Sequence, residues 1–375
     1  MKQMLHIRCK NNKKIKDVAI GSTLSEVFDE FKLEMPFGPI CAKVNNKVCG
    51  MNLCLYHNKD IEFLDMYNSS AQRNYTRTLF FILCKAVHDL YPGSEVVIDI
   101  PVSNGYYINL KVGHEVSEED AVRVRERMQQ IIDAKIPIVR YQVPTEEAIK
   151  MFESKGDEAK VKLLRSIGSL YTVYHQIDDY VDYYYGSLLP NTGDIYLFGL
   201  EKYYEGLLLR IPSKENPAKL GELIRQDKMF EVFLEQHRRQ HILGVSTVGD
   251  FNEAVQQGHA TDMINISEAL QEKKISQIAD RIAMHPDVRM VLIAGPSSSG
   301  KTTFCKRLSI QLLANGIRPV QISLDDYFVD RHRTPLDAME TLIMKAFMLW
   351  IFNSSTSNLV RFSVEMKWNY PNIIS

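Results

Sequence analysis

The chain has 375 residues, of which 45% are hydrophobic and 24% are charged, and its formal net charge is −1. This length exceeds one ordinary hydrophobic core, so we expect two or three domains. The balanced charge excludes a generally basic, nucleic-acid-binding surface, although it leaves room for a local patch. The six cysteines form no C-x-x-C pair and so indicate neither a zinc knuckle nor a redox motif. Without a signal-peptide core or a run of ~20 apolar residues, we expect a cytoplasmic protein that does not contact a membrane.

Residues 1–64 predict a small α/β unit. A helix is expected to run from Thr23 to Phe31, because Thr23 and Glu26 form a capping box. Strands are predicted at Met4–Cys9, Asp17–Ile20, Ile40–Val44 and Asp60–Leu64. This pattern resembles the TGS domain, a β-grasp-like module found at the N-terminus of threonyl-tRNA synthetases and in some GTPases. The resemblance implies a binding or regulatory module without catalytic residues.

Residues 65–235 predict an α+β domain. Its expected elements are a helix at Arg77–Leu90, strands at Val96–Ile100 and Asn104–Ile108, a helix at Ser117–Ala134, an extended segment at Ile136–Arg140 and a helix that begins at Glu146. Their order resembles the second additional domain of threonyl-tRNA synthetases, which edits mischarged tRNA. The resemblance implies that the two N-terminal domains contact RNA or a small ligand.

In that synthetase domain, two His on one helix and a later Cys and His supply metal-type ligands. Counting from the matching proline-containing segments places these positions on Phe81 and Lys85, and on Tyr184 and Leu188. None of these side chains can supply the imidazole or thiolate donor that such a site needs. We therefore expect a scaffold of the editing type that has lost its hydrolytic chemistry.

A cluster of four tyrosines allows two interpretations. Their rings could stack on RNA bases, as aromatic side chains do in single-stranded RNA recognition. Because no Lys or Arg accompanies them in the sequence, packing in a core or an interface is favoured. The cluster consists of Tyr180, Tyr183, Tyr184 and Tyr185.

Residues 236–287 predict a helical connector, and a phosphate-binding loop follows it. An apolar strand at 289–294, the pattern G-x-x-x-x-G-K-[ST] and a helix at 302–314 occur in the order that such a loop requires. Backbone N–H groups at the helix N-terminus would face the phosphates, Lys301 would reach the β- and γ-phosphates, and Thr302 would ligate Mg²⁺. The predicted site for ATP and Mg²⁺ comprises Gly295, Pro296, Ser297, Ser298, Ser299, Gly300, Lys301, Thr302 and Thr303.

A second predicted strand, Pro319–Leu324, ends at Asp325. A carboxylate at the carboxyl end of such a strand would face the γ-phosphate and could act as a general base. The run G-P-S-S-S-G-K-T-T, followed by S-L-D-D-Y-F, resembles the uridine kinase/phosphoribulokinase family. The resemblance implies a parallel-sheet P-loop kinase domain from residue 288, catalytic roles for Asp325 and Lys301, and phosphate transfer to a nucleoside such as uridine or cytidine.

The resemblance ends at residue 338, and residues 339–375 show no core pattern. We expect this aberrant tail to arise from a frameshift near Met339–Thr341, because a shifted reading of the codons restores acidic residues in register. The kinase domain would then be truncated and phosphate transfer impaired. Two alternatives remain open at this point: a nucleotide-binding regulatory or RNA-binding module without catalysis, and a P-loop GTPase. The sequence does not indicate an oligomeric state.

Overall fold

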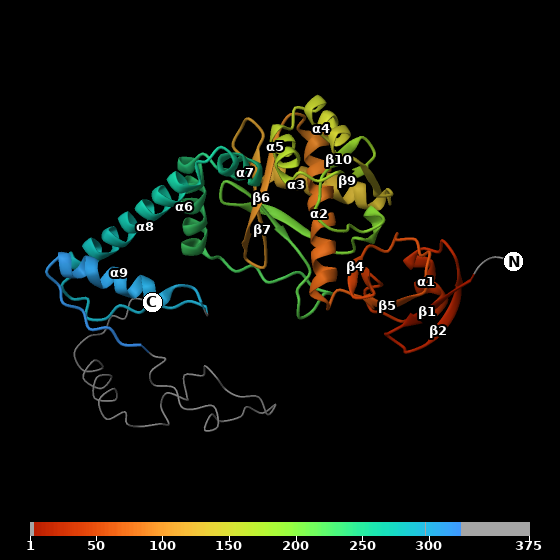
Figure 1. Ribbon diagram of the computed structural model, residues 1–375, viewed down its shortest axis with the longest axis horizontal. Coiled ribbons are helices and arrows are strands. Elements are labelled where there is room, and N and C mark those ends of the chain that lie inside the picture. The colour runs from red at the N-terminus through yellow and green to blue at the C-terminus, as the bar shows by residue number, and fades with distance from the viewer. Residues whose placement is uncertain (1–3, 297, 324–375) are drawn as a thin grey trace, which may run out of the picture. The chain divides into compact units, whose positions relative to one another are not determined.

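The computed structural model describes residues 4–296 and 298–323, and the chain divides into two compact units, residues 1–260 and 261–375 (Figure 1). Several separate sheets combine with helices, so the predicted mixed α/β and α+β multidomain architecture is confirmed. The assignment of particular segments to TGS and P-loop domains stays a prediction, as do the predicted domain boundaries. None of the described helices combines the length and apolar character that crossing a membrane requires.

The first unit begins with a five-stranded sheet of order β2-β1-β5-β3-β4. Strand β1 alternates exposed and buried residues, as expected for a sheet with one face on a core, and pairs antiparallel with β2 and parallel with β5. The predicted capping box of Thr23 and Glu26 begins α1, whose buried residues pack in the core beneath this sheet. The elements are β1 Met4–Cys9, β2 Ile15–Ala19, α1 Leu24–Phe31, β3 Cys41–Val44, β4 Lys47–Cys49 and β5 Lys59–Leu64.

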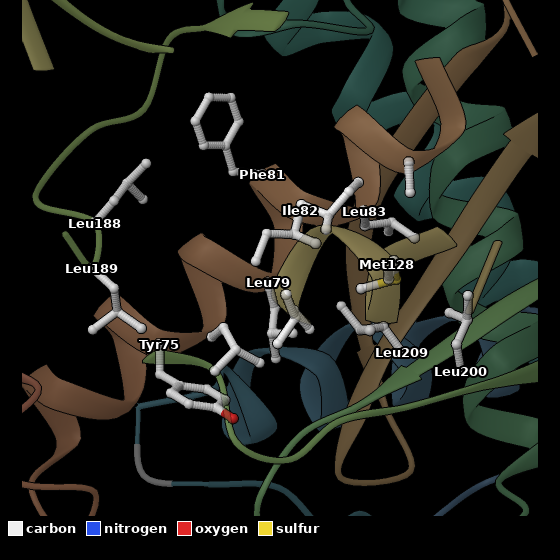
Figure 2. Packing of buried hydrophobic residues seen from close by; sticks show 14 of the residues in the cluster. Tyr75, Leu79, Phe81, Ile82, Leu83, Met128, Leu188, Leu189, Leu200 and Leu209 are labelled. Carbon is white, nitrogen blue, oxygen red and sulfur yellow. The ribbon is translucent and has the colours of Figure 1, made fainter. Parts of the chain in front are cut away.

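A four-stranded sheet of order β11-β12-β7-β6 forms the centre of the first unit together with α2 and α3. The largest buried cluster joins side chains of α2, α3, β11 and β12 (Figure 2), and it includes Ile40, Cys41 and Leu64 of the preceding segment. The N-terminal sheet therefore shares a continuous core with this part. The elements are α2 Ser69–Leu90, β6 Glu95–Val102, β7 Gly105–Lys111, α3 Glu118–Asp133, β11 Gly199–Tyr203 and β12 Gly206–Arg210.

A third sheet has three strands in the order β10-β9-β8, and α4 and α5 pack on it over one cluster of apolar side chains. Helix α6 packs on the central sheet through Phe230, and α7 is held against α5 by the ion pair of Lys162 with Asp250, at 3.0 Å. The elements are β8 Val139–Pro144, α4 Thr145–Ser154, α5 Glu158–Ile167, β9 Tyr171–Ile177, β10 Tyr180–Asp182, the 3-10 turn Thr192–Asp194, α6 Asp227–Leu243 and α7 Val248–Gln256.

The second unit is built on α8, Ala260–Ala283, and α9, Lys301–Ala314. Ile275 and Ala279 of α8 pack against Leu308 and Leu312 of α9, and Arg307 pairs with a carboxylate of α8. The described residues at 289–294 and 319–323 form no strand. A strand needs backbone hydrogen bonds to a neighbouring strand, and the described residues of this unit include no strand that could provide them. The parallel sheet therefore stays a prediction. Residues 324–375, which include the rest of the predicted kinase domain and the tail, lie outside the described residues.

Candidate functional site

The positions predicted to replace metal ligands meet around helix α2. Asn68 caps this helix through its side chain, which accepts a hydrogen bond from the Ser70 backbone N–H. Phe81 is fully buried, and its ring centroid lies 5.3 Å from that of Tyr184. Leu188 is also buried in this cluster, where Figure 2 shows it beside α2. Three of the four positions thus place two aromatic rings and an aliphatic side chain in this apolar cluster, and none of them supplies an imidazole or thiolate donor.

A thiol that the sequence analysis did not single out lies beside this aromatic pair. The Tyr184 hydroxyl donates to Cys84 Sγ over 4.0 Å. Burial raises the pKa of the Cys84 thiol to about 12 and also raises the pKa of Tyr184. The thiol therefore stays protonated at neutral pH, when only a thiolate is a good nucleophile or metal ligand. Within residues 4–296 and 298–323, no group of three or more His, Cys, Asp and Glu side chains is arranged to hold a metal ion.

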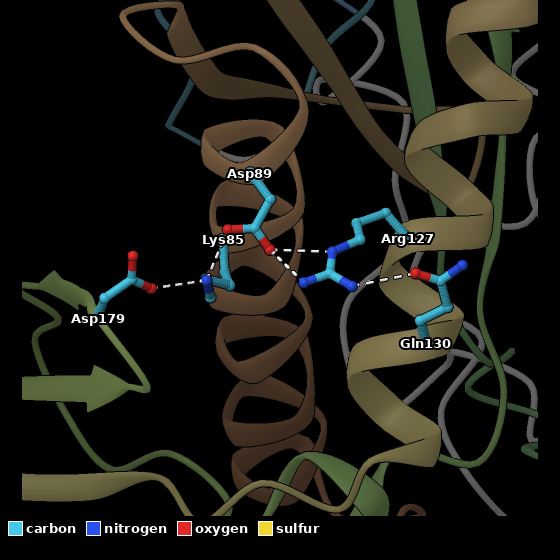
Figure 3. A network of polar contacts seen from close by, with 5 residues as sticks. All are labelled: Lys85, Asp89, Arg127, Gln130 and Asp179. Carbon is cyan, nitrogen blue, oxygen red and sulfur yellow. Dashed lines mark hydrogen bonds and ion pairs between the residues drawn. The ribbon is translucent and has the colours of Figure 1, made fainter.

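Lys85, the fourth position, belongs to a network of charges (Figure 3). Its ammonium group lies 2.6 Å from a carboxylate oxygen of Asp89 and 2.7 Å from one of Asp179. Arg127 of α3 donates from Nε and Nη2 to the other Asp89 oxygen, at 2.9 and 2.7 Å, and from Nη1 to Gln130. Burial alone would lower the pKa of Lys85, but the hydrogen bonds to the two carboxylates outweigh it and raise the pKa. The network joins α2, α3 and the β9–β10 turn.

A row of polar side chains on α2 fixes the segment that follows β10. Asn74 Nδ2 donates to Ser187 Oγ at 2.9 Å, and Arg77 Nη1 donates to the Ser187 carbonyl at 2.8 Å. The Leu189 backbone N–H donates to Thr78 Oγ1 at 2.9 Å. The sequence analysis missed Arg77, because its role depends on a contact 110 residues away.

The four tyrosines divide into two groups. Tyr180 and Tyr184 both contact Phe81, and Tyr183 packs against the cluster formed by α4 and α5. The packing role predicted for the cluster is therefore confirmed for three of them. Tyr185, by contrast, is 89% exposed.

The three-stranded sheet carries a row of polar side chains, of which His175 and Asp182 are buried. The register pairs Arg140 with His175 and His175 with Asp182, so their side chains share one face. Lys160 reaches Asp182 at 2.7 Å and Asp157 at 2.7 Å. Burial, aided by the positive charge of Arg140, lowers the pKa of His175 to about 4, so this imidazole is neutral at pH 7.

The predicted phosphate-binding loop forms a turn ahead of α9. Ser298 and Gly300 have φ of 60° and 82°, and helix α9 begins at Lys301, immediately after Gly300. Glycine reaches this left-handed region without a steric penalty. The Lys301 ammonium group donates to the Pro296 carbonyl at 2.7 Å, so it folds back over the loop.

Two residues of the predicted nucleotide site, Ser297 and Asp325, lie outside the described residues. Thr302 and Thr303 are exposed in the first turn of α9. The roles of Lys301 in phosphate binding, of Thr302 in Mg²⁺ binding and of Asp325 as a base stay predictions.

Comparison with known proteins finds threonine–tRNA ligases among the relatives of this chain, and no family model matches the chain. The threonine–tRNA ligase of Natranaerobius thermophilus is 29% identical over 193 residues, 51% of this chain and 30% of the ligase. The ligase of Syntrophomonas wolfei is 27% identical over 192 residues, 51% of this chain and 30% of the ligase. The ligase of Symbiobacterium thermophilum is 24% identical over 251 residues, 64% of this chain and 38% of the ligase. The chain thus spans about a third of the length of these curated relatives.

These relatives correct the predicted function. They agree with the synthetase resemblance of about half the chain, and they are named threonine–tRNA ligases rather than nucleoside kinases. The prediction of an ATP-dependent uridine-type kinase is therefore wrong, and a nucleoside partner is unsupported. The kinase prediction was weak because a phosphate-binding loop indicates triphosphate binding and does not identify a second substrate. The groups that would select an acceptor were expected beyond residue 323, outside the described residues.

Proposed function

We propose that the first unit is a tRNA-binding module that has kept the scaffold of a threonine–tRNA ligase N-terminal region without its metal-dependent hydrolysis. The observation that carries this proposal is the similarity of about half the chain to ligases whose substrate is tRNA. The continuous core that joins the N-terminal sheet to α2 supports a single rigid binding body.

The chemistry at the four replaced positions supports binding without hydrolysis. Phe81 and Tyr184 are in ring contact, Leu188 is aliphatic, and the ammonium group of Lys85 is committed to two carboxylates. These side chains do not fit a metal ion, which requires imidazole, thiolate or carboxylate donors. The protonated Cys84 thiol does not replace a lost ligand.

We further propose that the loop at 295–303 binds the phosphates of ATP with Mg²⁺. The turn at Gly300 and the helix that begins at Lys301 support this proposal, because backbone N–H groups at such a helix start favour an anion. Lys301 would exchange its contact with the Pro296 carbonyl for a phosphate oxygen, and Thr302 would ligate the metal.

A binding assay and a hydrolysis assay on the full chain test the tRNA proposal. We expect an unmodified tRNA transcript to bind more tightly than an unstructured RNA of equal length, with an affinity that falls as salt rises. We also expect mischarged tRNA to be deacylated no faster with the protein than without it, whether or not Zn²⁺ is added. Equal affinity for the two RNAs would refute specific tRNA binding, and zinc-stimulated deacylation would refute the loss of hydrolysis.

A further inference from the structure

Two arginines of α2, the exposed Arg73 and the half-buried Arg77, have only neutral hydrogen-bond partners. Arg73 and Arg77 are one helical turn apart, so their side chains are neighbours. Arg73 donates to Ser70 Oγ at 3.0 Å, and Arg77 donates to Asn74 Oδ1 at 2.9 Å and to the Ser187 carbonyl. Neither guanidinium forms an ion pair with any residue in the described part of the chain.

The surroundings of Arg77 destabilise its positive charge. Its side chain is half-buried, and burial, followed by the positive charge of Arg73, lowers the pKa of the Arg77 guanidinium. A partly desolvated cation beside a second cation is unfavourable unless an anion compensates it. Such an anion is therefore expected from outside the described chain.

The position of Arg77 is fixed in advance by its neighbours. Gly186 has φ of 105°, and a Cβ at Gly186 would lie 2.5 Å from Arg77 Nη1 and 2.9 Å from Cζ. Only glycine thus lets the backbone lie against the guanidinium. The hydrogen bonds described above use Nη1, so they do not engage the N–H groups of Nη2 and Nε. A planar fork of this kind matches the oxygens of a phosphate group.

An exposed aromatic residue is the sequence neighbour of Gly186, which lies close to the Arg77 guanidinium. Tyr185 immediately precedes Gly186 in the chain and is 89% exposed, whereas the other three tyrosines of the cluster are packed. Proteins that bind single-stranded nucleic acid combine cations that contact the backbone with aromatic rings on which bases stack. The arrangement therefore favours an RNA strand over an isolated inorganic anion.

We propose that Arg73 and Arg77 bind a backbone phosphate of an RNA strand and that Tyr185 stacks on a neighbouring unpaired base. This inference rests on the proposed tRNA-binding function and names the side chains that would make the contact. It assigns Arg77 to a binding role on the helix where the editing synthetases carry metal ligands.

The test measures RNA affinity of the full chain over a range of salt concentrations. The probes are a tRNA transcript and a single-stranded RNA oligonucleotide, and the variants are Arg73→Gln, Arg77→Lys and Tyr185→Ala. Arg125→Ala is the matched control, since Arg125 is an exposed arginine on α3. Thermal melting of each variant confirms folding.

We expect Arg73→Gln to weaken binding and to reduce the slope of log affinity against log salt by about 0.7 to 1, because one phosphate contact is lost. Arg77→Lys keeps the positive charge but loses the planar guanidinium with its two parallel donors. It should therefore weaken binding with little change in the slope of log affinity against log salt. Tyr185→Ala should weaken binding by about 5- to 100-fold, also without a change in slope. Arg125→Ala should leave both quantities unchanged.

The possible outcomes separate the two proposals. If tRNA binds and the three variants bind like the unsubstituted chain, the arginine site is refuted while tRNA binding stands. If the variants weaken binding of the oligonucleotide but tRNA shows no preference, the arginine site is supported and the tRNA function is refuted. If neither RNA binds, both are refuted.

Discussion

At the scale of single residues, His175 is a histidine whose surroundings oppose its protonation. Its side chain is only 3% exposed, and its pKa is lowered to about 4 by burial and then by Arg140. In the unfolded chain an imidazole titrates near 6.5. As pH falls from about 6.5 to 4, this histidine therefore gains a proton in the unfolded state but stays neutral in the folded state. The free energy of unfolding falls over that pH range.

Replacing this imidazole should remove that part of the acid sensitivity. We expect the unsubstituted chain to lose about 3 kcal/mol more stability between pH 7 and pH 4 than His175→Phe. Urea unfolding at a series of pH values measures the difference, and His57→Phe, at an exposed histidine, is the control. Parallel pH profiles for His175→Phe and the unsubstituted chain would show that His175 is protonated in the folded state.

At the scale of elements, the charge network of α2 and α3 predicts unequal effects for its two central members. Asp89 bridges the buried Lys85 and Arg127, so Asp89→Ala leaves two cations facing each other and should cost about 3 kcal/mol. Lys85→Met removes a buried charge. Asp89 then still forms its ion pair with Arg127, and the carboxylate of Asp179, which is 72% exposed, is solvated by water. The cost of Lys85→Met should therefore stay below about 1 kcal/mol.

Denaturant unfolding of the two variants decides whether this order is correct. Asp133→Ala, at the end of α3, is a control for removing a carboxylate outside the network. A greater loss of stability in Lys85→Met than in Asp89→Ala would mean that the lysine, rather than the bridging carboxylate, holds these elements together.

Elements with strong local signals could be predicted from the sequence. The capping box of Thr23 and Glu26 begins α1 as expected, and Ser117 begins α3. Helix α2 was predicted from Arg77 but begins at Ser69, because the cap of Asn68 was not recognised. Strand β9 was missed, since it pairs with β8, some thirty residues earlier, and β10, which pairs with β9, was missed with it.

The candidate site was predictable only where residues could be counted along a known pattern. That counting identified Phe81 and Tyr184, which the structure brings into contact. It missed Cys84 and Arg77, whose environments arise from distant parts of the chain. The phosphate-binding loop carries a strong local motif, but a local motif could not identify the partners of the whole protein.

At the scale of the whole molecule, the two proposed binding activities fall in different compact units. The proposed RNA contacts lie in residues 1–260, and the proposed phosphate contacts lie in residues 261–375. Lys301→Ala removes the cation expected to meet the phosphates. We expect this variant to lose the stabilisation that ATP with Mg²⁺ confers, about 2.7 kcal/mol when free ATP is 100 times its dissociation constant.

RNA affinity of the Lys301→Ala variant should equal that of the unsubstituted chain, because no RNA contact is assigned to the second unit. Thermal melting with and without ATP and Mg²⁺, together with tRNA titration of the same preparation, checks both expectations. Lys306→Ala, at an exposed lysine of α9, controls for loss of a positive charge outside the loop. If Lys301→Ala alone weakened tRNA binding, the RNA surface would extend onto α9, and the assignment of RNA recognition to the first unit would be wrong.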